Sequence, residues 1–231
     1  MHGLYLSMRC LVLFTVLLFR LGHLQAQVLV HEEPRHRPVF QNNKIRILNV
    51  LLPPGDTTQY HIHHTPSLFL FFTSTSTGSQ LQSTAASTGR STAGSLLFEN
   101  LAPPHVRVHR VWNMDTNTFH VMDIELLSKD SGFAQKPLVL PHLQLAIDTP
   151  WARVYQLTLE AGNDFTFRDT NRSLVLVSLD AAPVQMQQGR KTQQQTVRAG
   201  SFFWVKTRQS FALKNTGGAA ARFVLLEVPE P

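Results

Sequence analysis

The chain contains a single cysteine, Cys10, which lies in an apolar segment near the N-terminus. The rest of the sequence therefore cannot form disulfides, bind a metal through thiolates or use a cysteine nucleophile. Charged residues are also scarce, at 16% of the chain, and the formal net charge of +6 includes Arg9 and Arg20 beside that segment. No run of Lys and Arg interleaved with aromatic residues occurs, so we expect no nucleic-acid partner.

Common catalytic signatures are missing as well. There is no Gly-x-Ser-x-Gly elbow, phosphate-binding loop, Gly-x-Gly-x-x-Gly or His-Glu-x-x-His. The 15 Asp and Glu residues offer no pair that can be placed together for acid–base catalysis. After residue 30 no stretch of ten or more residues has helical periodicity.

The N-terminus has the pattern of a secretory signal. An apolar run, Cys10–Phe19, is bounded by arginines and is shorter than the roughly 20 residues that span a bilayer. We predict that residues 1–26 are a signal peptide cut before Gln27, which leaves no stable membrane span. An uncleaved membrane anchor is the alternative. Export without disulfides is typical of a bacterial envelope, so we expect a periplasmic or secreted protein.

Short β-like runs punctuated by Gly, Pro, Asn and Asp fill the remainder of the chain. They are Ile45–Leu52, Leu68–Phe72, Phe119–Leu127, Val154–Leu159, Leu174–Leu179, Phe202–Val205 and Phe223–Val228. Many short strands with frequent turn signals predict an all-β sandwich or barrel.

An internal repeat indicates two copies of one β-unit. Arg46 precedes Gly55 by nine positions, as Arg153 precedes Gly162, and in both cases apolar residues lie between them. Asn113 and Glu125 are likewise spaced as Asn215 and Glu227 are. We predict domains at 27–130 and 131–231. Within the first, the Ser- and Thr-rich residues 73–95 predict a solvent-facing hairpin, with a flap near the barrel mouth as the alternative.

The strongest chemical signal is the segment Gly55-Asp-Thr-Thr-Gln-Tyr-His61-Ile-His63. Alternate residues of a strand share a face, so His61 and His63 are predicted to point together into a barrel. His109 is the best candidate for a third ligand. The alternative is a histidine pair that only forms hydrogen bonds inside the barrel.

These residues resemble the two motifs of the cupin superfamily. Gly55, His61 and His63 match the first motif in type and spacing, and Pro104, His109 and Asn113 match the second. The resemblance spans essentially the whole chain after residue 26 and implies two tandem cupin barrels, a double-stranded β-helix or jelly-roll architecture. It also implies a small-molecule ligand and leaves a homodimer through outer strands open.

The departures from the motifs define the implied metal site. Ser67 or Leu68 stands where the first motif has a metal-binding Glu, and Phe98 and Val106 replace the glycines of the second, unless Gly94 is the first of them. The implied ligands are the imidazoles of His61, His63 and His109. They suit a divalent transition metal such as Fe, Zn, Cu, Ni or Mn and do not suit Mg or Ca. A centre without a carboxylate keeps its positive charge and would favour an anionic molecule.

Other polar residues near the motifs are weaker candidates. Gln59 and Tyr60 precede the histidine pair and Arg107 has the parity of His109, so all three are ligand-binding candidates, with strand-end or solvated turn roles as the alternatives. No catalytic residue is assigned, and Tyr60 and His105 are candidate bases only by proximity in the sequence. We expect ordinary roles for His64, His105 and His120.

The second repeat has lost the site. Counting from Gly162 puts Arg168 and Thr170 at the two histidine positions, and counting back from Asn215 puts Phe211 at the third. Two hypotheses follow: a metal-dependent cupin oxygenase, isomerase or lyase, or a non-catalytic binding or structural protein. The fold alone does not choose between them.

Overall fold

The computed structural model describes residues 27–129, 131–168, 171–205 and 208–229. The predicted signal segment, residues 1–26, lies outside the described residues. The described part consists of strands and one short 3₁₀ turn, η1 (Val30–Glu32), and contains no α-helix. None of its helical segments is long and apolar enough to cross a membrane. The predicted all-β class is confirmed, and each strand predicted from the sequence is present within about two residues of its expected bounds.

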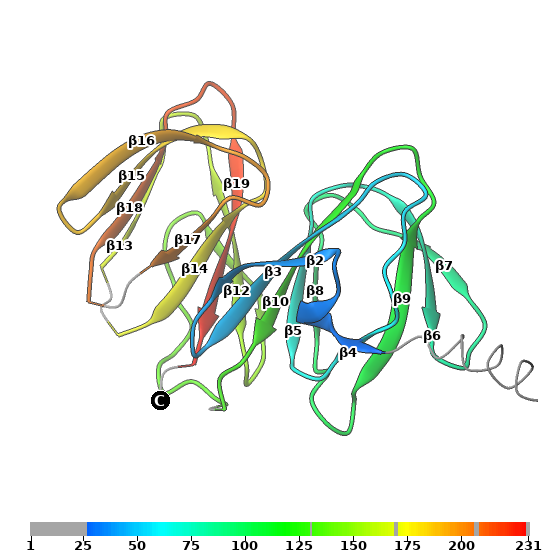
Figure 1. Ribbon diagram of the computed structural model, residues 1–231. Coiled ribbons are helices and arrows are strands. Elements are labelled where there is room, and N and C mark those ends of the chain that lie inside the picture. The colour runs from blue at the N-terminus through cyan, green and yellow to red at the C-terminus, as the bar shows by residue number, and fades with distance from the viewer. Residues whose placement is uncertain (1–26, 130, 169–170, 206–207, 230–231) are drawn as a thin grey trace, which may run out of the picture.

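Two barrel-like lobes lie side by side in Figure 1, and each is built from two facing sheets. The first lobe contains the sheets β1-β4-β9-β6-β7 and β2-β3-β10-β5-β8. Its strands are β1 (Val28–Leu29), β2 (His36–Gln41), β3 (Ile45–Leu52), β4 (His61–His63), β5 (Ser67–Phe71), β6 (Ser76–Leu81), β7 (Ser87–Arg90), β8 (Leu96–Glu99), β9 (Arg107–Asn113) and β10 (Phe119–Leu126).

The second lobe repeats this arrangement with the sheets β11-β12-β19-β14-β17 and β13-β18-β15-β16. Its strands are β11 (Leu143–Asp148), β12 (Arg153–Leu159), β13 (Asp164–Phe167), β14 (Ser173–Ser178), β15 (Ala182–Gln188), β16 (Lys191–Val197), β17 (Phe202–Val205), β18 (Phe211–Asn215) and β19 (Ala221–Val228).

The repeated Gly and Asn form the same turn in each lobe. Gly55 and Gly162 have φ values of +74° and +79°, a region that favours glycine, and their amides donate to the carbonyls of Asn113 and Asn215. The side chain of Asn113 donates in turn to the carbonyl of Leu52 at 2.9 Å. Asn215 makes the equivalent bond within the second lobe. These repeat residues therefore serve the fold and not the chemistry.

The repeated Arg and Glu lie opposite each other on neighbouring strands. Arg46 on β3 pairs in register with Glu125 on β10, and their side chains form an ion pair at 2.7 Å. Arg153 is opposite Glu227 in the same way, although there the Glu227 carboxylate pairs with Arg172 and accepts a hydrogen bond from Tyr155.

The two lobes share a core that we call the interbarrel core. Alternate residues of β10 face opposite sides, so Phe119 and Val121 point into the first barrel while Met122 and Ile124 point towards the second. The opposing face is supplied by β12, β14 and β19, which lie next to β3 and β10 in Figure 1. The interbarrel core is completely buried at most positions: Ile45, Ile47, Leu68, Leu70, Ile124, Val154, Val175, Val177, Val224 and Leu226.

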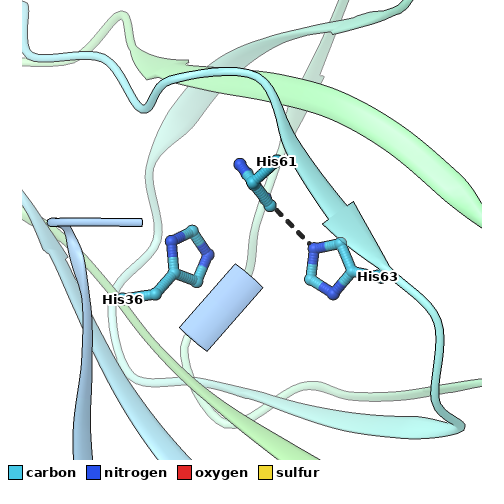
Figure 2. A group of neighbouring side chains, drawn as sticks. All are labelled: His36, His61 and His63. Carbon is cyan, nitrogen blue, oxygen red and sulfur yellow. Dashed lines mark hydrogen bonds between the residues drawn. The ribbon is translucent and has the colours of Figure 1, made fainter. Parts of the chain in front are cut away.

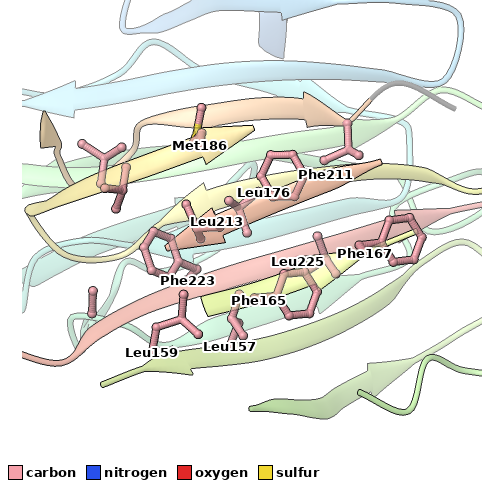
Figure 3. Close-up of a cluster of buried hydrophobic side chains, with 14 of the residues drawn as sticks. Leu157, Leu159, Phe165, Phe167, Leu176, Met186, Phe211, Leu213, Phe223 and Leu225 are labelled. Atoms are coloured by element: carbon pink, nitrogen blue, oxygen red, sulfur yellow. The ribbon is translucent and has the colours of Figure 1, made fainter. Parts of the chain in front are cut away.

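Large side chains fill the second barrel (Figure 3). Phe167 and Phe211 lie opposite each other on β13 and β18, as His61 and His109 do on β4 and β9. The residue equivalent to His61 is therefore Phe167, and the position expected from counting, Arg168, is wrong by one. Arg168 is exposed at the end of β13, and Thr170 lies outside the described residues.

The Ser- and Thr-rich residues 73–95 form the hairpin of β6 and β7. Every residue of β7 is exposed, as expected for a solvent-facing hairpin, whereas Thr77 and Ser79 of β6 line the interior of the first barrel.

Candidate metal centre

Three predicted ligands meet inside the first barrel. His61 and His63 project from one face of the short strand β4, and β9 places His109 directly opposite His61. The Nε2 atom of His63 lies 3.1 Å from the Nε2 atoms of both His61 and His109. The alternation expected from the sequence and the antiparallel β4–β9 register together place these three imidazoles side by side, with His63 Nε2 next to the other two.

A fourth histidine, which the sequence did not identify, joins the group. His36 begins β2, is buried, and offers a ring nitrogen that lies with those of His61 and His63 inside 4.8 Å of one another. Figure 2 shows its ring facing the other two. The rings of His36 and His109 both lie against that of His61, with centroid separations of 4.4 and 4.6 Å. No motif marks His36, because only the tertiary fold brings it to the site.

A polar group lies near the outer nitrogen of each histidine. His61 Nδ1 donates to the backbone oxygen of Gln59 at 2.9 Å, and because a carbonyl only accepts, its Nε2 presents a lone pair to the centre. His36 Nδ1 is held at 2.7 Å by Glu33. His63 Nδ1 lies 3.5 Å from a carboxylate oxygen of Asp123. His109 Nδ1 lies 3.5 Å from the hydroxyl of Ser79.

Burial keeps His61, His63 and His109 neutral. It lowers the pKa of His61 to about 4 and that of His109 to about 2, with neighbouring histidines adding to the effect. The pKa of His63 also falls well below its ordinary value, mainly through burial. At neutral pH these imidazoles are therefore unprotonated, which is the state that binds metals.

Two buried acidic residues, Glu33 and Asp123, lie beside the histidines. Burial opposes ionisation of Glu33, but its hydrogen bonds with His36 and with the Gln59 and Arg35 amides outweigh this and lower its pKa. Asp123 is completely buried, no hydrogen bond of ordinary geometry from the described residues reaches its oxygens, and burial followed by the charge of Glu125 raises its pKa well above the usual range. An acid at a position with inward-facing parity in a mainly apolar strand was a sequence signal that could have identified Asp123.

The histidines line a cavity of about 280 Å³. Its walls are mainly apolar and aromatic: Val50, Leu52, Phe69, Phe71, Leu97, Val111, Phe119 and Val121. Glu99 and Arg107 supply an ion pair, and Asp123 adds a buried carboxyl group. A cavity of this size and composition accommodates a small molecule next to the imidazoles.

The three predicted ligand-binding residues take different places. Arg107 lines the cavity, but its guanidinium is paired through two nitrogens with Glu99. Gln59 is exposed, and it contacts the cluster through its backbone N–H and carbonyl groups, not through its side-chain amide. Tyr60 lies outside the cavity lining, beneath the guanidinium of Arg110 at 5.2 Å.

The arrangement fits a transition metal. Imidazole nitrogens about 2.0–2.1 Å from an ion are about 3.3 Å apart in a tetrahedral shell and about 2.9 Å apart in an octahedral one. The observed Nε2 separations of 3.1 Å fall between these values. Facing lone pairs are also best satisfied by a cation at their centre, and an all-nitrogen donor set suits transition metals rather than Mg or Ca.

No family model and no curated protein matches the sequence. Solved structures do match the fold. AerE from Microcystis aeruginosa aligns over 86% of this chain and 99% of its own, with a TM-score of 0.60 and 8% identity. A salicylate 1,2-dioxygenase from Pseudaminobacter salicylatoxidans aligns over 84% of this chain and 77% of its own, with a TM-score of 0.59 and 13% identity. A cupin 2 conserved barrel domain protein from Leptotrichia buccalis aligns over 83% of this chain and 87% of its own, with a TM-score of 0.53 and 10% identity.

The chain has a bicupin fold. The resemblance to cupins is thus confirmed at the level of the fold, and at these identities the likeness says nothing of the reaction. In this bicupin the position of the missing motif Glu carries no metal donor. Leu68 belongs to the interbarrel core, and Ser67 is buried on β5 without lining the cavity.

Proposed function

We propose that this bicupin binds one divalent transition metal ion in its first barrel through His61, His63 and His109. The observation that carries the proposal is a group of three buried, neutral imidazoles in which His63 Nε2 lies 3.1 Å from the Nε2 atoms of His61 and His109. The metal is one of Fe, Zn, Cu, Ni or Mn. When bound, it would supply a Lewis-acidic centre with coordination positions for a small molecule or dioxygen.

The protein's own residues would select and orient that molecule. The apolar wall holds an organic body and excludes water, and the metal charge favours an anionic group on it. Arg107 would contact such a group only after leaving Glu99, so the metal itself is the main attraction for the anion. The chemistry we propose is that of a metal-dependent oxygenase, isomerase or lyase, and the presence of a dioxygenase among the structural neighbours is consistent with it.

Export is part of the same proposal. The arginine-bounded apolar run predicts cleavage before Gln27 and delivery to the periplasm or the exterior. Mass spectrometry of the protein recovered from a bacterial envelope fraction should give a chain that begins at Gln27. Recovery of only the uncut chain in membranes would support the anchor instead.

Metal content tests the central claim. Plasma mass spectrometry of purified protein should find near-stoichiometric metal in the wild type and little in His61→Ala/His63→Ala. The matched control is His105→Ala, which removes an exposed histidine outside the cluster. A wild type that remains metal-free after reconstitution with Fe, Zn, Cu, Mn and Ni would overturn the proposal.

Turnover separates the enzyme from a binding protein. Metal-loaded protein should consume dioxygen or deplete substrate within a panel of small carboxylic acids and diketones. Bound metal with no turnover across the panel would favour the alternative, a non-catalytic bicupin that holds a small molecule.

A further inference from the structure

The segment that precedes the first barrel runs alongside the proposed metal centre. We call residues 28–36 the N-terminal strap. Its first part, β1, pairs in parallel with the ligand strand β4, so that Val28 lies opposite His61. Val30 is completely buried, and the strap ends at His36. The strap therefore closes one side of the histidine cluster.

Glu33 fastens the strap to the ligand strand. One carboxylate oxygen accepts from the amide of Gln59 at 3.1 Å, directly before the ligand pair. The other accepts from the amide of Arg35 at 2.8 Å and holds His36 Nδ1 at 2.7 Å. Since this carboxylate occupies Nδ1, the nitrogen that His36 offers to the centre is Nε2. A single acid thus orients His36 and joins the strap to the site.

The ligand shell has room for this nitrogen. The position at which the cupin motif carries a Glu has no donor here, and the three proposed ligands leave at least one coordination position free. His36 is buried, belongs to the cluster, and lies in ring contact with His61.

We propose that His36 is a fourth ligand of the metal and that the N-terminal strap is a metal-dependent latch of the first barrel. The inference rests on the proposed function, because it needs an ion bound by His61, His63 and His109. The ring nitrogens of His36, His61 and His63 lie within 4.8 Å of one another, so an ion held by His61 and His63 is within reach of His36 at the end of the strap. By linkage, metal stabilises the docked strap and the docked strap strengthens metal binding to the same extent.

The first test is zinc affinity, measured by competition with a chromophoric chelator. His36→Ala should weaken zinc binding by at least about tenfold, comparable to His109→Ala, because each variant removes one of four donors. His105→Ala should bind as the wild type does. Far-UV circular dichroism and the urea midpoint of each zinc-free variant establish that it is folded.

The second test is hydrogen–deuterium exchange of peptides covering residues 28–36, with and without zinc. In the wild type, zinc should slow exchange of the strap about tenfold or more, because its opening then costs a metal bond. In His36→Ala with saturating zinc, the strap should exchange as it does without metal. Arg35→Ala is the matched control: it removes the outer ion pair with Asp56 but no donor, so zinc should still protect the strap.

The outcomes distinguish the two claims. A wild type that binds no zinc overturns the proposed function and the latch together. Zinc bound through His61 and His63 with unchanged affinity in His36→Ala, and with a strap that zinc does not protect, overturns the latch alone. Weakened binding without zinc-dependent protection would show that His36 only supports the fold of the site, and would also overturn the latch.

Discussion

The chemical difference between the two barrels lies in a handful of interior side chains. Aligning the lobes by their shared Asn and Glu sets His109 against Phe211 and Asp123 against Leu225, and strand pairing sets His61 against Phe167. The second barrel thus shows which apolar residues the same scaffold accepts at the site. It provides templates for substitutions that remove chemistry while preserving packing.

Asp123→Leu should have opposite effects on metal binding and on stability. It removes the polar group that lies 3.5 Å from His63 Nδ1, which should loosen that imidazole and lower zinc affinity about 10- to 100-fold. It also removes a buried acid that lacks ordinary hydrogen bonds, which should raise the free energy of unfolding of the zinc-free protein by about 1–3 kcal/mol. Chelator competition and urea unfolding measure the two quantities.

Asp123→Asn is the matched variant, because it keeps a side-chain oxygen beside His63 Nδ1 and removes the titratable proton. It should retain more affinity than the leucine variant. Unchanged zinc affinity in both variants would show that Asp123 does not position His63.

The depressed histidine pKa values predict acid sensitivity of the zinc-free protein. Below about pH 6.5, His61 and His109 bind protons in the unfolded chain but not in the folded protein, where their pKa values are about 4 and 2. Their contribution to stability is therefore complete above pH 6.5 and falls as the pH drops towards those folded pKa values. Each histidine contributes a slope of up to about 1.4 kcal/mol per pH unit. Urea unfolding in the presence of a chelator at several pH values measures this slope.

The slope of the wild type alone does not report the histidines, because Asp123 changes the stability with pH in the opposite direction. Its raised pKa stabilises the fold at low pH and loses that contribution as the pH rises through the folded value. His61→Phe/His109→Phe copies the second barrel and leaves Asp123 in place, so the difference in slope between it and the wild type reports the histidines. Equal slopes would contradict the assigned shifts.

At the scale of elements, close approach of β6 and β9 depends on one glycine. A Cβ atom at Gly78 would lie 1.9 Å from the Trp112 indole, which rests on the backbone of β6. Gly78→Ala should therefore displace the indole and lower the free energy of unfolding by about 1–3 kcal/mol. Urea unfolding monitored by tryptophan fluorescence measures the change.

The same hairpin offers the control. Gly89 on β7 has no heavy atom within 4 Å of its would-be Cβ. Gly89→Ala should therefore change stability by less than about 0.5 kcal/mol. Equal effects of the two substitutions would exclude the Trp112 contact as the cause.

The elements also show where sequence patterns succeed. Strands buried on both faces, such as β10 and β14, are mainly apolar and were predicted almost to the residue. The strand β7 and all of β16 before Val197 carry no apolar side chain that could give such a signal. Their pairing partners, rather than their own residues, make them strands.

At the scale of the molecule, the interbarrel core should make the two lobes unfold together. Ile124 is completely buried in this core and faces away from the metal cavity. Ile124→Ala should cost about 2–5 kcal/mol and lower the urea midpoint of both lobes equally. Tryptophan fluorescence and far-UV circular dichroism should give one coincident transition before and after the substitution.

Val139→Ala, which shortens a side chain that is 92% exposed, should leave the midpoint unchanged. Separate transitions for the two probes would show that the lobes are energetically independent despite their shared core.

The sequence by itself determined the all-β class, the two-copy architecture and the pairing of His61 with His63. These depend on alternation along one strand and on turn residues at fixed spacing, which are local properties. It also indicated that the second copy had lost its site. Because the turn after Gly162 differs by one residue, counting from that glycine identified Arg168 where strand pairing identifies Phe167 as the equivalent of His61.

Only the tertiary structure decided which other groups reach the cluster. His36 and Glu33 arrive on a strap that pairs in parallel with β4, and Asp123 arrives on a strand of the facing sheet. It equally decided that Arg107 is paired with Glu99 and that Gln59 acts through its backbone. Contacts between distant segments depend on strand register and sheet order, and no spacing within one segment encodes them.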